Sequence, residues 1–270
     1  MLIVMKAGGD LLVNGFPESL AAEIKTLSGE HRFVIVHGGG DIVTDISTRL
    51  GHPPRFVMSP RGFKSRYTDK QTAEIYTMVM AGKINKEIVS VLQRAGVQAV
   101  GLSGLDGGVI RAIRKEKIIA LDERKRKILV DGGYTGQIER VNVDFLHLLV
   151  SNGYMPVISA VAMGAQAEPL NVDGDRMAAN VAAALKSDRL ILLTDVDGIM
   201  MEGKRIERLS SFEAKDLQDR IGSGMSTKVY AAQEAVKGGV SEVIIASGFK
   251  ERAIESRSYS PAHCSGRISL

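Results

Sequence analysis

Two lysines beside glycine-rich strings are the residues best suited to chemistry on an anion. Lys6 follows the apolar run at 2–5 and opens the string KAGGD, and Lys228 closes the string GSGMSTK at 222–228. A third string, HGGGD at 37–41, follows the apolar run FVIV. Glycine lets the backbone approach a ligand closely, and free N–H groups at a helix start attract anions. These strings together predict an anion-binding site.

Several common phosphate and ester sites are excluded by missing motifs. The chain has no GxxxxGK[ST] string of the P-loop type and no GxGxxG after a strand. The HRD and DFG signatures of protein kinases are also absent. The HGGG string resembles a lipase oxyanion loop, but that mechanism needs a GxSxG nucleophile, which the chain lacks.

The second half adds carboxylates and an amide at places where strands end or helices begin. Asn171, Asp173 and Asp175 alternate in the string NVDGD, directly before an expected helix. One of the two carboxylates is expected to cap that helix, and the set exceeds what capping alone requires. The string TDVDGI at 194–199 follows an apolar run and predicts a turn suited to a ligand's polar edge.

The elements that must position these groups alternate between strand and helix. Apolar runs suited to strands occur at 2–5, 33–37, 97–102, 155–161, 189–196 and 242–247. Between them, apolar residues recur with a helical period, as in Leu20, Ile24 and Leu27; Ile42, Ile46 and Leu50; and Ile84, Ile88 and Leu92. This alternation predicts an α/β fold, an αβα sandwich with a mostly parallel open sheet. We expect one domain with two lobes dividing near residue 170, and antiparallel hairpins at 109–136.

Composition is that of a folded protein without a membrane span. The chain has 270 residues, 44% of them hydrophobic and 24% charged, and no run of about 18 apolar residues. Its start has no signal-peptide pattern, and the single cysteine, Cys264, cannot form an internal disulfide. We therefore expect a cytoplasmic protein without a structural metal.

The net charge of +4 is concentrated in one segment. Residues 111–127 hold eight basic and three acidic side chains. This segment is expected to form either a solvated hairpin or a docking surface for an acidic partner. Nucleic-acid binding is disfavoured because the segment has no aromatic residue.

The motifs in this order resemble the amino acid kinase family, and in particular its acetylglutamate kinase branch. The matching strings are KAGG, VIVHGGG, GFKSRYTD, LNVDGD, LLTDVDGI and GMSTKV. The resemblance implies transfer of the ATP γ-phosphoryl group to a side-chain carboxylate, with Mg²⁺ carried by the nucleotide. It further implies a homodimer, with substrate binding and dimerisation on lobe 1–170 and nucleotide binding on lobe 171–270.

The resemblance also assigns roles to single residues. Lys6 and Lys228 would neutralise the phosphoryl group, Asp175 would orient both lysines, and Gly8 and Gly9 would present N–H groups to it. Gly39, Gly40, Arg66 and Asn171 would bind the substrate, with Arg66 clamping its α-carboxylate. The nucleotide pocket would be lined by Gly8, Asp195, Val196, Gly198, Ile199, Met200, Gly224 and Met225.

Departures from the branch point to an unusual substrate. The branch pattern Asn-x-Asn-x-Asp is replaced by a string with Asp173 in its middle, and the expected lid at 61–69 is strongly basic. This combination resembles relatives that phosphorylate aminoadipate or glutamate attached to the terminal glutamate of LysW, an acidic amino-group carrier protein. Docking of such a carrier would use Arg61, Lys64, Arg124, Lys125, Arg126 and Lys127. Free N-acetylglutamate, the substrates of other family members, and an inactive binding module remain alternatives, and the preferred side-chain length is left open.

Overall fold

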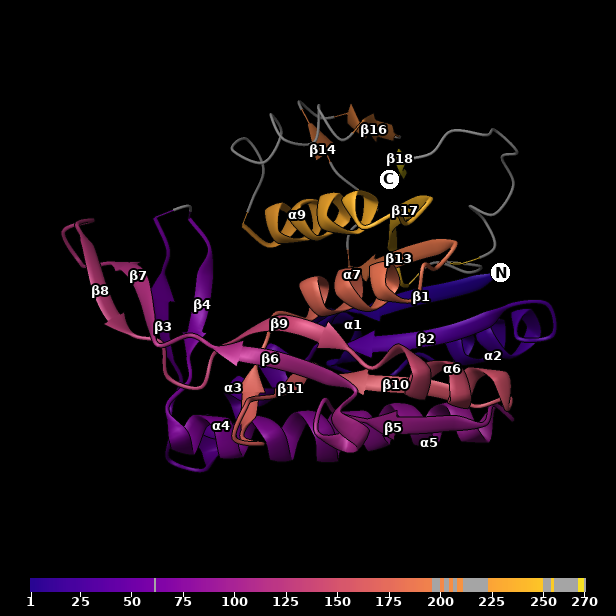
Figure 1. The fold of residues 1–270 in the computed structure, drawn as a ribbon, viewed down its shortest axis with the longest axis horizontal. Helices are drawn as coiled ribbons and strands as arrows, with labels where there is room; N and C mark the ends of the chain where they lie inside the picture. The colour runs from indigo at the N-terminus through magenta and orange to yellow at the C-terminus, as the bar shows by residue number, and fades with distance from the viewer. Residues whose placement is uncertain are drawn as a thin grey trace.

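Eight strands form the central sheet, in the order β16-β18-β17-β13-β1-β2-β10-β5 (Figure 1). The computed structural model describes residues 1–60, 62–195, 200–201, 204–205, 208–210, 223–249, 254 and 267–269. The strands are β1 (Leu2–Ala7), β2 (Arg32–His37), β5 (Ala99–Leu102), β10 (Met155–Ser159), β13 (Arg189–Thr194), β16 (Arg208–Ser210), β17 (Glu242–Ser247) and β18 (Arg267–Ser269). Only β16 runs antiparallel to its neighbour in this sheet. The expected α/β fold with a mostly parallel open sheet is confirmed.

Helices cover the sheet because its strands are apolar on both faces. Consecutive residues Ile3, Val4 and Met5 of β1 are all buried, which requires packing on each side of the strand. The helices are α1 (Gly9–Leu12), α2 (Glu18–Leu27), α3 (Gly40–Arg49), α4 (Lys70–Thr77), α5 (Asn85–Arg94), α6 (Val143–Ser151), α7 (Gly174–Ala184) and α9 (Ser223–Lys237). A π-helix, η1 (Met78–Ile84), joins α4 to α5, and a short 3₁₀ turn, η2 (Asp106–Gly108), follows β5.

The helical periodicity of the sequence mostly marks the buried face. Ile84, Ile88 and Leu92 are all buried, as predicted. The prediction that Leu50 is buried is wrong, because the residue is 56% exposed. It follows the last residue of α3 as the C-cap, and the buried positions of that helix are Val43 and Ser47.

Strands between residues 55 and 171 form two further sheets, which are antiparallel except for the parallel pair of β6 and β11. One contains β6 (Ile110–Arg114), β9 (Gly136–Val141), β11 (Val161–Met163) and β12 (Pro169–Asn171), in the order β12-β11-β6-β9. The other contains β3 (Arg55–Met58), β4 (Lys64–Tyr67), β7 (Lys117–Leu121) and β8 (Lys127–Asp131), in the order β4-β3-β7-β8. We call the second one the small sheet; it projects from the left end of the molecule (Figure 1). The hairpins predicted at 109–136 are confirmed, although they divide between the two sheets.

The two halves of the chain meet inside one sheet. Strand β1 pairs on one side with β2 and on the other with β13, and α7 packs across β1, β2 and β13. The division into a substrate-binding and dimerisation lobe at 1–170 and a nucleotide-binding lobe at 171–270 remains a prediction. Another short hairpin consists of β14 (Met200–Met201) and β15 (Lys204–Arg205). Among the residues described, no helix has both the length and the apolar character needed to cross a bilayer.

Candidate active site

Three loops meet at the carboxyl ends of β1 and β2. A Cβ atom added to Gly9 would lie 3.5 Å from the Cα of Gly39, and one added to Gly174 would lie 3.9 Å from the Cα of Gly38. The same hypothetical atom on Gly174 would lie 3.6 Å from Cε of Lys6. These are ordinary van der Waals distances, so the three loops lie directly against one another. The glycine strings therefore surround Lys6, as the sequence predicts for an anion site.

Asp175 bridges the two predicted catalytic lysines. Lys6 Nζ lies 2.8 Å from Oδ1 of Asp175, and Lys228 Nζ donates to Oδ2 at 3.4 Å. Lys6 comes from β1 and Lys228 from α9, so the carboxylate joins the two halves of the chain. Asp175 has two lysine partners and cannot lie far from either without losing a charge-assisted hydrogen bond.

Burial and charge act against each other in this cluster. Burial alone would lower the pKa of Lys6, but attraction to Asp175 and their hydrogen bond outweigh it and raise that pKa. Burial likewise would raise the pKa of Asp175, yet attraction to Lys6 and Lys228 holds it below its usual value. Lys6 and Asp175 are therefore both charged at neutral pH.

Asp173 has a different role from Asp175. Its Oδ1 accepts a hydrogen bond from the backbone N–H of Arg176 at 2.9 Å, which makes it the N-cap of α7. This confirms the expectation that one of the two carboxylates caps the helix. Burial, followed by repulsion from Asp175, raises the pKa of Asp173.

The buried side chains of His37 and Asn85 support the loop of Gly38, Gly39 and Gly40. His37 Nδ1 lies 3.0 Å from the carbonyl oxygen of Gly38, and Asn85 Nδ2 donates to His37 Nε2 at 3.1 Å. These bonds require a neutral imidazole with its proton on Nδ1. Burial accordingly lowers the pKa of His37 to about 4.

Gly39 itself has a backbone conformation that favours glycine. Its φ is 145°, and a Cβ atom at this position would overlap the side chain of Ile84. Ile84 is the last residue of the π-helix η1. π-Helical turns occur frequently at functional sites, and here the turn places Ile84 under the loop and Asn85 against His37.

Arg66 reaches from the small sheet towards the same loop. Its Nη2 donates at 2.8 Å to the carbonyl oxygen of Gly40 and, at the same distance, to Oγ1 of Thr44. Its Nη1 is buried and has no hydrogen-bond partner among the described residues. Burial lowers the pKa of Arg66. A buried guanidinium with one free N–H edge is suited to a carboxylate.

A cleft of about 380 Å³ contains most of these groups. Asn171 lines it and donates through Nδ2 to Oγ1 of Thr68 at 2.9 Å, which fixes its amide. The cleft is lined by Lys6, Gly9, Gly39, Gly40, Arg66, Asn171 and Asp175 from the predicted set. The structure thus brings together the predicted catalytic and substrate residues from the first 175 positions.

Two cations that were not predicted from the sequence also line this cleft. Arg176 donates through Nε and Nη2 to both carboxylate oxygens of Glu234, at 2.8 and 2.6 Å, and its guanidinium lies 5.4 Å from the ring centroid of Tyr230. Lys115 lines the cleft from the loop between β6 and β7. A signal for Arg176 was its place next to Asp175, whereas Lys115 was hidden within the basic run at 111–127.

The hairpin of β3 and β4 also contacts the second half of the chain. Phe63, beside the turn of this hairpin, and Tyr230 of α9 form an edge-to-face pair with centroids 6.5 Å apart. Tyr230 is two residues from Lys228 on the same helix. The hairpin that holds Arg66 is therefore connected to the helix that holds Lys228.

The predicted nucleotide residues are only partly described. Asp195 is exposed directly after β13 and accepts a hydrogen bond from the Thr194 hydroxyl at 3.0 Å. Gly224 is exposed and Met225 partly buried near the start of α9, and Met200 begins β14. Predictions for Val196, Gly198 and Ile199, like Arg61 and Cys264, lie outside the described residues.

Two of the predicted docking residues, Lys64 and Lys127, lie on strands of the small sheet. In register across it, Lys64 is opposite Met58, Met58 is opposite Leu121, and Leu121 is opposite Lys127. Residues directly opposite each other in antiparallel pairs share a face. We call these four residues the docking row. Two exposed lysines thus flank two apolar residues on one face.

The remaining basic residues form the turn between β7 and β8. Arg124, Lys125 and Arg126 are exposed, and Arg126 forms an ion pair with Asp122 at 2.7 Å. Asp122 also accepts from the backbone N–H groups of Arg124 and Arg126 and so holds the turn. Lys125 adopts a φ of 59° at its apex.

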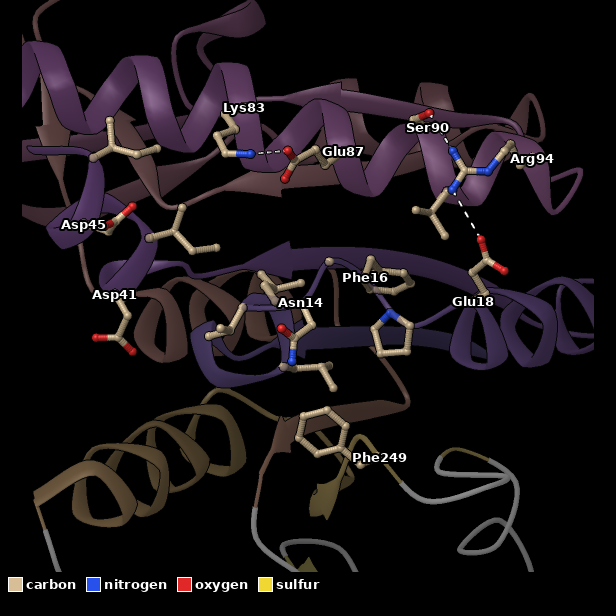
Figure 2. A pocket seen from close by; sticks show the side chains of 18 of the residues that line it. Asn14, Phe16, Glu18, Asp41, Asp45, Lys83, Glu87, Ser90, Arg94 and Phe249 are labelled. Atoms are coloured by element: carbon tan, nitrogen blue, oxygen red, sulfur yellow. Dashed lines mark hydrogen bonds and ion pairs between the residues drawn. The ribbon is translucent and has the colours of Figure 1, made fainter. Parts of the chain in front are cut away.

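A larger groove of about 990 Å³ lies between α3, α5 and the segment at 11–18 (Figure 2). Most of its charges are paired with one another: Lys83 with Glu87, Arg94 with Glu18 at 3.5 Å, and Arg49 with Asp45 at 3.4 Å. None of the predicted catalytic residues lines it. We therefore place the active site in the smaller cleft.

Among the described residues, no three His, Cys, Asp or Glu side chains gather in a way that could bind a metal ion. The cleft instead combines glycine loops, two lysines on one carboxylate and an arginine in a parallel α/β sheet. Such a site is suited to stabilising a negatively charged group while it is transferred.

Sequence comparison identifies the family to which this fold and site belong. The sequence pattern of the amino acid kinase family matches residues 1–247, and the chain belongs to this family. A protein of Metallosphaera sedula named LysW-aminoadipate/LysW-glutamate kinase is 45% identical over 256 residues, which are 94% of this chain and 96% of that protein. A protein of Cenarchaeum symbiosum, provisionally named for the same activity, is 51% identical over 94% of this chain and 95% of its own length.

Solved structures share the fold. N-acetylglutamate synthase from Neisseria gonorrhoeae matches with a TM-score of 0.80 and 24% identity. The match covers all of this chain but 59% of that longer protein. Carbamate kinase from Giardia matches with a TM-score of 0.65 over 99% of this chain and 98% of the other.

Proposed function

We propose that the chain phosphorylates the side-chain carboxylate of aminoadipate or glutamate attached to the carrier protein LysW, using ATP with Mg²⁺. The observation that carries this proposal is the joining of Lys6 and Lys228 to one carboxylate in a cleft continuous with a basic and apolar docking face. The names of the relatives from Metallosphaera sedula and Cenarchaeum symbiosum supply the carrier. The product is an acyl phosphate, as an intermediate of lysine or arginine biosynthesis requires.

The transfer needs positioning and charge rather than a base. A substrate carboxylate is already ionised at neutral pH, so its oxygen can attack the γ-phosphorus directly while the bond to the ADP oxygen breaks. Negative charge spreads over the moving phosphoryl group, and Lys6 and Lys228 would neutralise it from the two halves of the chain. Asp175 holds both ammonium groups, and the N–H groups of Gly8 and Gly9 would bind the phosphoryl oxygens.

The substrate would extend from the glycine loop towards Arg66. Gly39 and Gly40 would hold its reacting end, the free Nη1 edge of Arg66 would bind its α-carboxylate, and Asn171 would contact the amide that links it to the carrier. Arg66 is oriented by Gly40, so the clamp and the loop are one rigid unit.

Nucleotide binding would take place on the second half of the chain. Asp195, Gly224 and Met225 are the described residues of the proposed pocket, with Val196, Gly198, Ile199 and Met200 completing it. We assign Mg²⁺ to the nucleotide phosphates, because the nearby carboxylates of Asp173 and Asp175 already bind a helix N-terminus and two ammonium groups.

The docking row supports a carrier-linked substrate. Phe56, two residues before Met58 on β3, lies on the same face of the small sheet and lines the catalytic cleft together with Lys64. Met58 is 40% exposed, and on the same face exposed Ile119 and Leu129 lie opposite each other. An acidic carrier would be steered by the lysines and by the turn at 124–127, and would bury these apolar side chains.

A homodimer built through the first lobe also remains part of the proposal. Exposed apolar side chains on the helices of this lobe, Leu50, Met78 and Leu148, are candidates for its interface. Sedimentation equilibrium would measure the mass directly, and a monomer at micromolar concentration would contradict the proposal.

The function is tested by an ATP-dependent hydroxamate assay, which traps acyl phosphates. Carrier protein bearing aminoadipate or glutamate is compared with free N-acetylglutamate. Activity on the carrier alone is expected. Activity on N-acetylglutamate alone would make this an acetylglutamate kinase, and no activity on any acceptor would support an inactive binding module.

A further inference from the structure

Lys115 is a cation of the catalytic cleft without a partner in the mechanism above. It is half-buried, and its ammonium group makes no hydrogen bond or ion pair in the described part of the chain. The other cations that line the cleft already have a role or a partner. Lys6 pairs with Asp175, and Arg176 pairs with Glu234. Lys64 lies over the ring of Phe56, and the free edge of Arg66 is assigned to the substrate's α-carboxylate. The cleft therefore offers one positive charge more than the transfer requires.

The backbone holds Lys115 in a fixed place. Its N–H donates to the carbonyl oxygen of Thr135 at 2.8 Å, and the next residue, Glu116, accepts from the N–H of Gly132 at 2.9 Å. A Cβ atom on Gly132 would overlap the carbonyl oxygen of Lys115, so this close approach requires glycine. Here the connection between β6 and β7 lies against the connection between β8 and β9.

This position lies between the docking face and the reacting loops. β7 belongs to the small sheet that contains the docking row, whereas β9, the partner of β6, lines the cleft through Gly136, Gln137 and Ile138. Lys115 lies where the connection from β6 enters the small sheet, so it is placed to meet the part of a substrate nearest that sheet.

The chemistry of the linker identifies the ligand. A terminal glutamate has two carboxyl groups, of which one forms the amide to the substrate amino acid and the other stays free. An N-acetyl group has no charge at that place. We propose that Lys115 binds the free carboxylate of the carrier's terminal glutamate and so distinguishes carrier-linked from acetylated substrates, an inference that rests on the proposed function.

The charges around Lys115 agree with an anionic ligand. Burial, followed by repulsion from Arg176, lowers the pKa of Lys115, while Asp173 acts in the opposite direction. The carboxylate of Asp173 already accepts a hydrogen bond as the N-cap of α7. A carboxylate beside Lys115 would stabilise its charged form, and a neutral methyl group would not.

The test changes both partners. Lys115→Met and Lys115→Arg are assayed with aminoadipate-loaded carrier and with a semisynthetic carrier whose terminal glutamate has a carboxamide in place of its free carboxylate. For the wild type, the carboxamide should raise KM by about 10- to 100-fold, the effect of one hydrogen bond to a charged group. Lys115→Met should raise KM for the natural carrier by a similar factor, leave kcat unchanged and be insensitive to the carboxamide. Lys115→Arg should retain most of the discrimination.

The control is Lys117→Met, an exposed lysine two residues further along the same hairpin, which should affect both carriers equally. Circular dichroism and KM for ATP report whether each variant is folded. Equal losses of Lys115→Met on both carriers, or no loss, would overturn the role of Lys115 while leaving the proposed function intact. A wild type inactive on both carriers would overturn the proposed function and this inference together.

Discussion

Lys6 Nζ lies 2.8 Å from Oδ1 of Asp175, and both side chains are more than 90% buried. Removing one partner of a buried ion pair leaves the other charge without compensation. Asp175→Asn should therefore lower kcat by about 100- to 1,000-fold, as expected for lost charge positioning, and reduce the free energy of unfolding by about 3 kcal/mol. Hydroxamate kinetics and urea unfolding measure the two effects. A variant with wild-type kcat would remove Asp175 from the mechanism.

The parallel sheet and the meeting of the glycine loops were predictable from sequence. Runs such as LILL are apolar at every position, and only a strand covered on both faces requires that pattern. The carboxyl ends of parallel strands lie at one edge, so the strings after β1 and β2 had to meet. The bridging of Lys6 and Lys228 by Asp175 was expected from the family resemblance rather than from spacing.

Other features depend on contacts that no local pattern records. Leu50 continued the period of α3, but the helix ends at Arg49 and the periodicity cannot show where a cap falls. Lys115 has the same sequence surroundings as the exposed basic residues that follow it. Its place in the cleft results from the pairing of β6 with β9, two strands separated by the β7–β8 hairpin.

Lys228 provides a sharper kinetic test because its removal leaves Lys6 to neutralise Asp175. Lys228→Met should lower kcat by about 100-fold or more, since its charge acts on the transferring phosphoryl group. KM for ATP should change much less. The matched control is Lys237→Met, at an exposed lysine in the last turn of the same helix, which should retain wild-type kinetics. Equal kinetics of the two variants would contradict the catalytic role.

The buried imidazole of His37 predicts a pH dependence of stability. Its pKa in the folded protein is about 4, below the ordinary value of 6.5. Between these values the unfolded chain binds the proton and the folded chain does not, so stability is lost as the pH falls from 6.5 to 4. The linkage amounts to about 3 kcal/mol. Urea unfolding at pH 7 and pH 4.5 measures it.

His37→Gln should lose this part of the pH dependence. The variant should also have a higher KM for the amino acid substrate, because the carbonyl of Gly38 loses its donor. His147→Gln, at an exposed histidine on α6, should keep the wild-type difference between the two pH values. If the wild type and His37→Gln lose equal stability on acidification, the imidazole is not the group that titrates.

The contact of Phe63 with Tyr230 predicts communication between the hairpin of Arg66 and the helix of Lys228. Phe63→Ala should raise KM for the carrier-linked substrate and lower kcat, because aromatic pairs of this kind contribute about 0.5 to 1.5 kcal/mol. Phe249→Ala is the control, because this exposed phenylalanine lines the larger groove (Figure 2) and not the catalytic cleft. Steady-state kinetics with varied carrier and varied ATP separate the two parameters. Normal kinetics of Phe63→Ala would mean that the contact has no part in catalysis.

Charge reversal in the turn between β7 and β8 tests the docking surface. Replacement of Arg124, Lys125, Arg126 and Lys127 by glutamate should raise KM for the carrier-linked substrate and leave ATP kinetics unchanged, because the turn is exposed and does not line the cleft. Since Arg126 also holds the turn through Asp122, a second variant spares Arg126 and should give a similar result.

Salt separates steering from folding defects in these variants. At physiological ionic strength, dissolved salt screens the attraction between exposed charges over a distance of about 8 Å. Raising the salt concentration should therefore increase KM of the wild type and lower KM of the reversed variants, because salt screens the repulsion between their glutamates and an acidic carrier. Reversal of Lys186 and Lys237, exposed lysines outside the small sheet, should preserve the wild-type response. If the two sets of reversals behave alike, net charge rather than the docking surface attracts the carrier.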